Sequence, residues 1–518
     1  MKTLNIYLTT AILFSLFLSS CGEDFLDLQP LDQEVSSNFY QTEEQAFQAL
    51  VAIYDALTYQ DTPGVGWSPI ITVSDALSDD AFAGGSDAND GLYFDQLSRF
   101  NIDPTNTIIH SLWIKNYIGI YRANLFLEVI DDIDASADFK ARTIAEAKFL
   151  RAYFYFELVR FFENIPLLTE TIAGPSEYVQ DQNSPEEVYN QIALDLVEAS
   201  ADLPSSVSAA EAGRLTRWAA KALLARVYLF YNGVYNAELV AGNTPVNRTF
   251  VLQQLEELIS NSGHDLFEDY ALNFRLAGEF GVESVFEISY GDTPPWWDWG
   301  YIRGGNGNLS AQMQGPRVTG SNNWNRGWSF APVNHKLAMD LEGDPRFAYT
   351  ILTEEEIDGN LVKGYQHTGY FSRKYSSDAE HWGSDGQFEL NRTCNHRVIR
   401  FSDVLLMAAE LDSPNKQQYL DRVRDRVGLP SVPATMENIL RERRLELSLE
   451  GLRYHDVIRQ GMAYANQQLS HSGIRGPRYE GDQQIFDVTF NPATRGFLPI
   501  PQTEMDLSGG AFRQNEGY

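Results

Sequence analysis

The sequence has little cysteine and far fewer basic than acidic residues. Only two cysteines, Cys21 and Cys394, occur among 518 residues, which excludes a disulfide framework. Lys and Arg together number 39 against 71 Asp and Glu, for a formal net charge of −32. Because so acidic a chain repels phosphate backbones, nucleic-acid binding is not expected as its main role.

The familiar catalytic and metal-binding motifs are also missing. The chain has no HExxH, no G-x-S-x-G, no Walker loop and no cysteine or histidine cluster with zinc spacing. Asp87-Ala88-Asn89-Asp90-Gly91 resembles a calcium loop, but its glycine comes one place early and no glutamate follows at the required distance. We interpret it as a solvated acidic turn, and we expect neither a metal nor a cofactor.

Long hydrophobic runs are absent, and the one that comes nearest lies at the N-terminus. The largely apolar run 6–18 follows Lys2 and is too short to span a bilayer, as in a secretory signal peptide. Leu18-Ser19-Ser20-Cys21 resembles the lipobox of bacterial lipoproteins, which predicts a signal peptide over 1–20 and acylation, for example by palmitate, at Cys21. The alternative is an ordinary signal peptide with a chance cysteine. The acidic residues after Cys21 resemble the tag that sends some Gram-negative lipoproteins to the outer face of the outer membrane.

Most of the chain shows helical periodicity, so the predicted fold class is mostly α. In 139–162 apolar residues occupy nearly every face, which is typical of a buried helix. Residues 60–104 and 486–518 read as irregular, 286–290 alternate as in a half-buried strand, and Asn232-Gly233 is expected to end a helix. The predicted helices are 42–59, 107–130, 139–162, 184–201, 215–231, 400–411, 416–427, 436–449 and 451–464.

The order of these segments predicts three regions within 21–518, which we expect to form one compact unit. Residues 21–280 are helical and contain a loop region, 60–100; 281–395 are rich in loops and have little β structure; and 396–518 are helical again. Helical hairpins in series loosely resemble tetratricopeptide repeats, although the period is irregular.

Tryptophan is concentrated in the loop-rich region. Five of nine fall within 33 residues, where even spreading would place roughly half of one. Loops lie at the surface, and flat rings suit the apolar faces of sugars, with Asn, Asp and Arg reading hydroxyls. The equally weighted alternative is that the rings pin the segment to the helices. The candidate ligand-binding residues are Trp296, Trp297, Trp299, Trp324, Trp328, Asp298, Arg303, Asn322 and Asn325, with Trp67 expected on the same surface.

Several short segments follow one another in a distinctive order: Tyr121-Arg122-Ala123-Asn124, EAKFLRAY at 146–153, Asn164-Ile165-Pro166-Leu167, RWAAKALLARVY at 217–228, RFSDVLLMAAE at 400–410, ERRLEL at 442–447, Glu450-Gly451-Leu452-Arg453, Leu498-Pro499-Ile500-Pro501 and the ending Gln514-Asn515-Glu516-Gly517-Tyr518. Taken in order, these segments resemble the SusD/RagB family of outer-membrane nutrient-binding lipoproteins. We interpret Arg443, Arg444, Glu446 and Glu450, at one-turn spacings, as an ion-paired scaffold.

The resemblance implies four tetratricopeptide-like units packed against a variable, loop-rich half. It implies a non-enzymatic protein that binds glycans at the cell surface and delivers them to a TonB-dependent outer-membrane transporter of the SusC type. The alternatives are a RagB-like peptide binder and a surface glycoside hydrolase, the latter suggested by the acids beside the Trp cluster. Ligand is expected at loops corresponding to 60–100 and 290–330.

Overall fold

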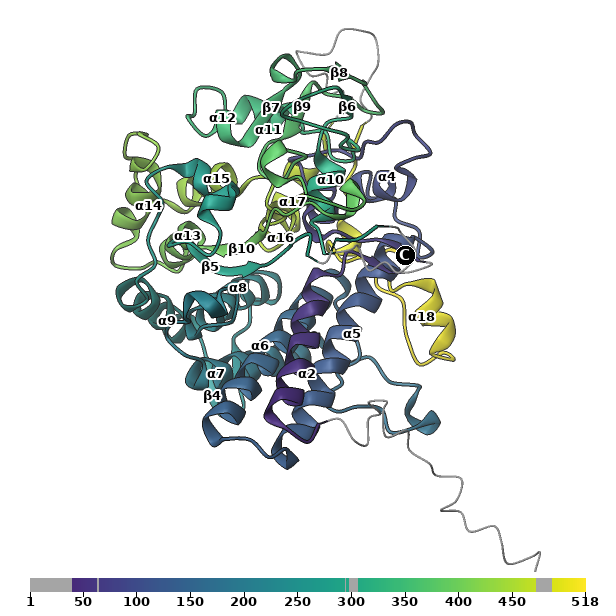
Figure 1. Cartoon of the computed structure of the whole chain (residues 1–518), viewed down its shortest axis with the longest axis vertical. Helices are drawn as coiled ribbons and strands as arrows, with labels where there is room; N and C mark the ends of the chain where they lie inside the picture. Colours follow the sequence, from purple (N-terminus) through teal and green to yellow (C-terminus); the bar gives the residue numbers. More distant parts are fainter. Residues whose placement is uncertain (1–39, 63–64, 294, 298–305, 472–486) are drawn as a thin grey trace, which may run out of the picture.

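The computed structural model describes residues 40–62, 65–293, 295–297, 306–471 and 487–518. Within them the chain forms seventeen α-helices and five two-stranded antiparallel sheets, so the predicted mostly α fold is confirmed (Figure 1). None of the described helices combines the length and the apolar character needed to cross a bilayer. The predicted signal peptide and Cys21 lie outside the described residues.

The N-terminal half is a series of helices in which neighbours along the chain pack together. Contacts join α5 to α6, α6 to α7, α7 to α8 and α8 to α9, and α2 packs on both α5 and α6. This arrangement fits helical hairpins in series, while their tetratricopeptide character stays a prediction. The helices are α2 (Glu43–Asp55), α5 (Thr107–Val129), α6 (Ala137–Phe162), α7 (Pro185–Asp202), α8 (Arg217–Tyr235) and α9 (Arg248–Asn261).

Local sequence signals set where these helices begin. The Thr42 side chain accepts from the backbone N–H of Gln45, and Ser184 and Glu187 form a reciprocal capping box at the start of α7. Helix α6 is buried over almost its whole C-terminal two thirds, as its apolar composition predicted. Caps and apolar periodicity therefore located the long helices to within a few residues.

One predicted helix end is wrong for a reason that lies elsewhere in the chain. Helix α8 continues through Asn232 and Gly233 to Tyr235 and ends at Asn236, which adopts the left-handed conformation. A Cβ atom on Gly233 would lie 2.4 Å from the carbonyl oxygen of Arg459. This glycine therefore permits a close approach of two backbone segments and does not stop the helix.

The C-terminal half is also helical, and its strands join it to the centre of the molecule. Strand β5 (Ser284–Ile288) pairs antiparallel with β10 (His396–Arg400), which leads directly into α13 (Phe401–Glu410). The half-buried strand predicted at 286–290 is observed as Ser284–Ile288, and of its predicted polar face Ser289 is exposed but Glu287 is buried. Glu287 accepts from Asn395 Nδ2 at 2.8 Å. The remaining helices here are α14 (Lys416–Asp425), α15 (Met436–Leu447), α16 (Arg453–Ile458), α17 (Met462–Leu469) and α18 (Gln502–Leu507).

Three further predictions about regular structure need correction. The single helix expected over 451–464 is divided into α16 and α17 at Gly461, whose φ is 94°. The region 60–104, expected to be loops, contains the short helices α3 (Ile70–Ala76) and α4 (Leu92–Ser98), and α18 interrupts the irregular C-terminal segment.

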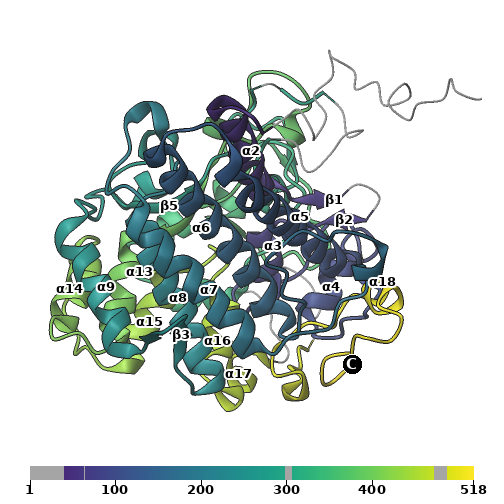
Figure 2. The ribbon, with the colours of Figure 1, turned by 90° about the horizontal axis from the view of Figure 1, so that it is seen from below.

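Figure 2 shows β1 (Asp61–Thr62) and β2 (Gly66–Trp67) lying beside α5, which they contact.

The loop-rich region between the two halves carries the remaining short elements. They are α10 (Leu309–Gln314), β6 (Val318–Thr319), α11 (His335–Asp340), α12 (Phe347–Thr350), β7 (Ile351–Thr353), β8 (Asn360–Leu361) and β9 (Tyr370–Ser372). The hairpin of β3 (Leu239–Ala241) and β4 (Thr244–Val246) lies in the N-terminal half, between α8 and α9. The main hydrophobic core extends from Ala46 in α2 to Ile500 near the C-terminus, so residues of both halves share it.

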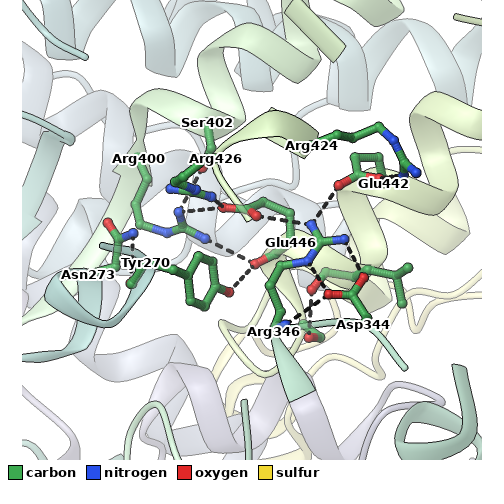
Figure 3. A network of polar contacts seen from close by, with 12 residues as sticks. Tyr270, Asn273, Asp344, Arg346, Arg400, Ser402, Arg424, Arg426, Glu442 and Glu446 are labelled. Atoms are coloured by element: carbon green, nitrogen blue, oxygen red, sulfur yellow. Dashed lines mark hydrogen bonds and ion pairs between the residues drawn. The ribbon is translucent and has the colours of Figure 1, made fainter. Parts of the chain in front are cut away.

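The ion-paired scaffold predicted near α15 is present, but its partners are distant in sequence. Glu446 pairs with Arg400, Arg426 and Arg346 (Figure 3). Glu450 pairs with Lys374 and Arg400. The pairing therefore joins separate segments, where the one-turn spacing had suggested contacts along a single helix. His455, on α16, is buried, and burial holds its pKa well below the usual range, which fits a core polar residue.

Candidate functional site

Seven of the ten candidate ligand-binding residues lie in the described part of the chain. Trp299, Asp298 and Arg303 lie outside it. The structure separates the seven into an exposed group, a partly buried group and one core residue, so the Trp cluster contains both exposed and buried rings.

The structure brings Trp67 and Trp328 together across more than 250 residues of sequence. Their ring centroids lie 5.2 Å apart at an interplanar angle of 37°. Trp67 ends the β1–β2 hairpin, which Ser68 and Thr62 fix to α5 by hydrogen bonds to Ser111 Oγ at 2.9 Å each. Trp67 keeps 36% of its surface exposed, and Trp328 packs with one side against the main core. The pair thus forms a partly exposed aromatic surface, and its role in ligand binding stays a prediction.

A second aromatic element lies at 295–297. The backbone of Trp296 is held by the side chain of Asn391, which donates to its carbonyl at 2.8 Å and accepts from its N–H at 2.9 Å. The backbone N–H of Gln387 donates to the same carbonyl at 2.6 Å. Trp297, the next residue, exposes 68% of its surface. Anchoring one tryptophan by its backbone therefore presents the following ring to solvent.

Segment 387–391 connects the two aromatic elements, and no sequence pattern pointed to it. Glu389 accepts from the indole N–H of Trp328 at 3.2 Å and from the side-chain amide of Gln387 at 3.1 Å. The same segment therefore touches Trp328 through Glu389 and Trp296 through Gln387 and Asn391. Its position inside the predicted loop-rich region was a general signal, but no motif identifies these residues.

A buried arginine holds the loop that carries Trp328. Arg392 is 1% exposed and donates to Gln312 Oε1 at 2.8 and 2.9 Å and to the carbonyl of Asn325 at 2.8 Å. Burial lowers the pKa of Arg392 to about 10, so the side chain remains a cation at neutral pH. Gln312 in turn accepts through its backbone carbonyl from the N–H of Trp328 at 3.0 Å. The loop that carries Asn325 and Trp328 is thus held in place by the buried side chain of Arg392 and by Gln312.

Burial contradicts one candidate, Trp324, and backbone hydrogen bonds place two others, Asn322 and Asn325, whose role as ligand-facing groups stays a prediction. Trp324 is 5% exposed and packs with Val318, Leu352 and Phe371, so its ring belongs to a small core and offers no stacking face. Asn325 contributes its backbone carbonyl to Arg392. Asn322 is exposed, and its backbone N–H donates to Asp358 at 2.8 Å. Trp324 was misjudged because composition cannot separate a core ring from a surface ring inside one loop-rich segment.

The acidic turn at 87–91 lies near this surface and is closed by its own hydrogen bonds. Asp90 accepts from the N–H and hydroxyl of Ser86 at 2.7 and 2.8 Å, and Asp87 from the N–H of Asn89 at 2.8 Å. Arg317 reaches Asp90 at 3.0 Å and also donates to the carbonyl of Trp328 at 3.1 Å. Within the described residues no group of three or more His, Cys, Asp or Glu side chains is placed to hold a metal ion.

The described part of the arrangement offers aromatic faces and polar groups to a ligand. Exposed rings at Trp67 and Trp297, with carboxylate, amide and guanidinium groups between and behind them, suit a polyhydroxylated ligand that has apolar faces. Cys394 is buried, and burial raises the pKa of its thiol to about 12, which makes it a poor nucleophile. The described residues thus form a mostly helical fold with a partly exposed aromatic surface, to which the loop-rich region contributes Trp297 and Trp328 and the β1–β2 hairpin contributes Trp67.

Comparison with known proteins identifies the family. Residues 24–229 match a family model described as starch-binding associating with outer membrane, and 297–518 match the SusD family model. A solved laminarin-binding SusD-like protein is 33% identical with a TM-score of 0.80, covering 92% of this chain and all of that one. The chain belongs to the SusD family.

Two further relatives extend the comparison. Surface glycan-binding protein A from Bacteroides thetaiotaomicron, solved in complex with laminarihexaose, is 28% identical with a TM-score of 0.79 and covers 92% of this chain and 100% of that one. SusD-like protein P25 of Formosa agariphila is 26% identical over 513 residues, covering 89% of this chain and 90% of that protein. The ligands in these names are those of the relatives. This chain shares their family.

Proposed function

We propose that this chain is a non-enzymatic, cell-surface glycan-binding lipoprotein. It captures a glucan of the laminarin type and delivers it to a partner TonB-dependent outer-membrane transporter, with Cys21 carrying the lipid that anchors it to the outer membrane. The observation that carries the proposal is the laminarin-binding relative, which is 33% identical over 92% of this chain. The outer-membrane description of the family model supports the location.

The ligand surface in this proposal comprises Trp297, Trp67 and Trp328. Trp297 and Trp67 supply exposed ring faces, and Trp328 supports Trp67 from the core side. Glu389 and Gln387 lie between the two aromatic elements and offer hydrogen-bonding groups to hydroxyls. Trp324 is excluded from the surface by its burial.

Calorimetric titration with laminarihexaose tests the proposal. We expect saturable binding, weakened roughly tenfold by Trp297→Ala and by Trp67→Ala, because loss of one stacking face costs on the order of 1.4 kcal/mol. Tyr178→Ala is the matched control, since Tyr178 exposes the same 68% of its surface as Trp297 and lines a groove beside α5 whose lining includes none of Trp67, Trp297 and Trp328. Its affinity should equal that of the unsubstituted chain.

Each other outcome has a definite meaning. Full affinity in both Trp variants would refute the assigned surface while leaving glycan binding intact. Heat that continues after every injection would indicate turnover and return the hydrolase alternative. No binding of any glycan, together with competition by peptides, would replace the proposal with the peptide-binding alternative.

A further inference from the structure

The β1–β2 hairpin places a carboxylate beside the Trp surface, which is formed by Trp67, Trp297 and Trp328. In this hairpin Asp61 lies directly opposite Trp67, and Thr62 lies opposite Gly66. Residues opposite each other in an antiparallel pair project to the same side, with their Cβ atoms about 5 Å apart. The Asp61 side chain therefore lies beside that of Trp67, whose ring is in contact with Trp328.

The contacts on the two sides of the hairpin agree with this placement. Thr62 Oγ1 lies 2.9 Å from Ser111 Oγ, so the Thr62 side of the hairpin faces α5. Successive side chains of a strand point to opposite sides. Asp61 therefore faces away from α5, on the side where Trp67 reaches Trp328 of the loop-rich region.

The protein supplies no cation for this carboxylate. Asp61 is half-buried, and in the part of the chain that the structure describes no side chain donates a hydrogen bond to it or forms an ion pair with it. Burial raises the pKa of Asp61 to about 7, and the backbone N–H of the adjacent Thr62 lowers it. A half-buried carboxylate without a counter-ion is unfavourable unless hydrogen-bond donors reach it. A ligand at the Trp surface can supply such donors.

The charged groups of the neighbouring elements are held by other partners. Strand β1 contacts β2 and α5, and β2 contributes no titratable side chain. None of the charged groups on α5 or around Trp328 contributes to the pKa of Asp61 among the described residues. These groups and their partners are His110 with Glu504, Arg122 with Asp55, Lys115 near Glu157, Arg317 with Asp90, Arg326 over the ring of Phe388, and Glu389 with the indole of Trp328.

A sugar that stacks on Trp67 turns its hydroxyls toward the edge of the ring, where Asp61 lies. Hydrogen bonds from hydroxyls to an ionised carboxylate are charge-assisted and roughly twice as strong as neutral ones. We propose that Asp61 is a ligand-binding residue of the Trp surface, and that its carboxylate accepts from hydroxyls of a sugar stacked on Trp67.

This assignment rests on the proposed function and narrows the class of ligand to neutral glycans. A glycan that carries carboxylates or sulfates would be repelled by Asp61, within a chain whose net charge is −32. Hydroxyls of a neutral glycan, in contrast, can donate to both oxygens of the carboxylate.

Binding at this carboxylate should release a proton. Near pH 7 Asp61 is about half protonated in the free protein, and donation from hydroxyls favours the ionised form. Each bound ligand therefore releases up to about half a proton at pH 7. If the ionised form alone binds, the affinity rises about tenfold from pH 6 to pH 8, because the ionised fraction grows from about one tenth to about nine tenths.

Calorimetric titration with laminarihexaose at pH 7, in phosphate and in Tris, measures the released proton, since the two buffers differ in ionisation enthalpy. We expect about half a proton from the unsubstituted chain and none from Asp61→Asn. Asp61→Asn should also lower the affinity at pH 8 about fivefold and bind equally well at pH 6 and pH 8. Thermal unfolding midpoints check that this variant is folded, and the proton released by the unsubstituted chain is a measurement that needs no variant.

Glu279→Gln is the matched control. Burial also raises the pKa of Glu279 to about 7, and this residue is likewise half-buried, but it accepts from the backbone N–H of Asn395 at 3.1 Å. The control should keep both the proton release and the tenfold rise in affinity. If Glu279→Gln abolished them, the titration would belong to Glu279 and the role of Asp61 would be refuted.

The remaining outcomes separate the role of Asp61 from the proposed function. Saturable binding that releases no proton and has the same affinity at pH 6 and pH 8, or proton release that Asp61→Asn retains, would overturn the role of Asp61 and leave glycan binding intact. An affinity that falls as the pH rises would overturn it as well, because the protonated carboxyl would then be the binding form. No binding of any glycan by the unsubstituted chain between pH 6 and pH 8 would overturn the proposed function itself.

Discussion

Trp328 shows how a few single contacts determine the candidate site. Its indole N–H donates to Glu389, its backbone N–H donates to Gln312, and its ring lies against Trp67. The Glu389 contact fixes the ring plane, because a rotated indole would lose its acceptor. The sequence predicted that Trp67 and Trp328 share a surface, but Glu389 lies some sixty residues from Trp328 and carries no signal that would link the two.

Removal of the Glu389 acceptor should weaken glycan binding without unfolding the protein. We expect Glu389→Ala to lower the affinity for laminarihexaose about fivefold, because one lost hydrogen bond costs on the order of 1 kcal/mol. Glu389→Gln keeps an acceptor oxygen for the Trp328 indole and should remain within about twofold of the unsubstituted chain. Titration calorimetry checks both, with thermal unfolding midpoints as the test of folding. An equal loss in the two variants would mean that charge, and not the position of Trp328, is what matters.

At the scale of elements, local sequence signals predicted the long helices. They did not predict elements whose structure depends on contacts with distant segments. The range 139–162 and the observed Ala137–Phe162 agree because apolar residues and the Ser136 cap are both local. Helix α3 was missed because its carboxylate, Asp75, is buried and accepts from the N–H of Gly451 and the amide of Gln314, contacts that no sequence pattern reveals. The burial of Trp324 has the same origin, since its neighbours Leu352 and Phe371 come from separate strands.

Helix α8 offers a test of how a distant segment acts on an element. Gly233→Ala raises intrinsic helix propensity by about 1 kcal/mol, yet the new Cβ would meet the Arg459 carbonyl oxygen at 2.4 Å. We expect net destabilisation of about 1–2 kcal/mol, because overpacking against backbone exceeds the gain in propensity. The unfolding midpoint in guanidinium measures it, followed by circular dichroism.

Gly174 is the matched control for this substitution. Its φ is 177°, an extended conformation open to any residue, and a Cβ atom added there would have no neighbour within 4 Å. Gly174→Ala should therefore leave the midpoint unchanged or raise it slightly. A more stable Gly233→Ala variant would show that α8 and the Arg459 segment can separate at little cost.

At the scale of the whole molecule, a buried network of ion pairs around Glu446 joins segments that lie far apart in the sequence. Glu446 on α15 pairs with Arg400 at 2.9 Å, with Arg346 at 3.1 Å and with Arg426 (Figure 3). Its backbone carbonyl accepts from Lys374 at 3.0 Å. These partners come from the end of β10, the start of α12, the end of α14 and the strand-flanking segment after β9. The network therefore fixes the loop-rich region, which carries the Trp surface, to the C-terminal helices.

Neutralising the centre of this network should destabilise the whole fold. We expect Glu446→Gln to lower the free energy of unfolding by about 3–5 kcal/mol, because it leaves buried guanidinium groups without their shared carboxylate. Glu437→Gln removes an exposed carboxylate from the same helix and should change stability by less than about 0.5 kcal/mol. Chemical unfolding of the unsubstituted chain and of the two variants at pH 7 measures how much each substitution changes the free energy of unfolding. Equally small changes in both variants would show that the other partners of the arginines are sufficient to stabilise their charge.

The stability difference between the unsubstituted chain and Glu446→Gln should depend on pH, because the folded protein lowers the pKa of Glu446. Burial alone would raise this pKa, but Arg426, Arg400 and Arg346 outweigh it and hold the pKa well below the usual range of a glutamate. The carboxylate therefore contributes stability that is fully present above the unfolded-state pKa, about 4.3, and is lost as the pH falls through the folded-state value. The stability difference between the unsubstituted chain and Glu446→Gln should accordingly stay constant from pH 7 to about pH 5 and narrow only in stronger acid. A difference that shrinks already between pH 7 and pH 5 would assign the effect to another titrating group.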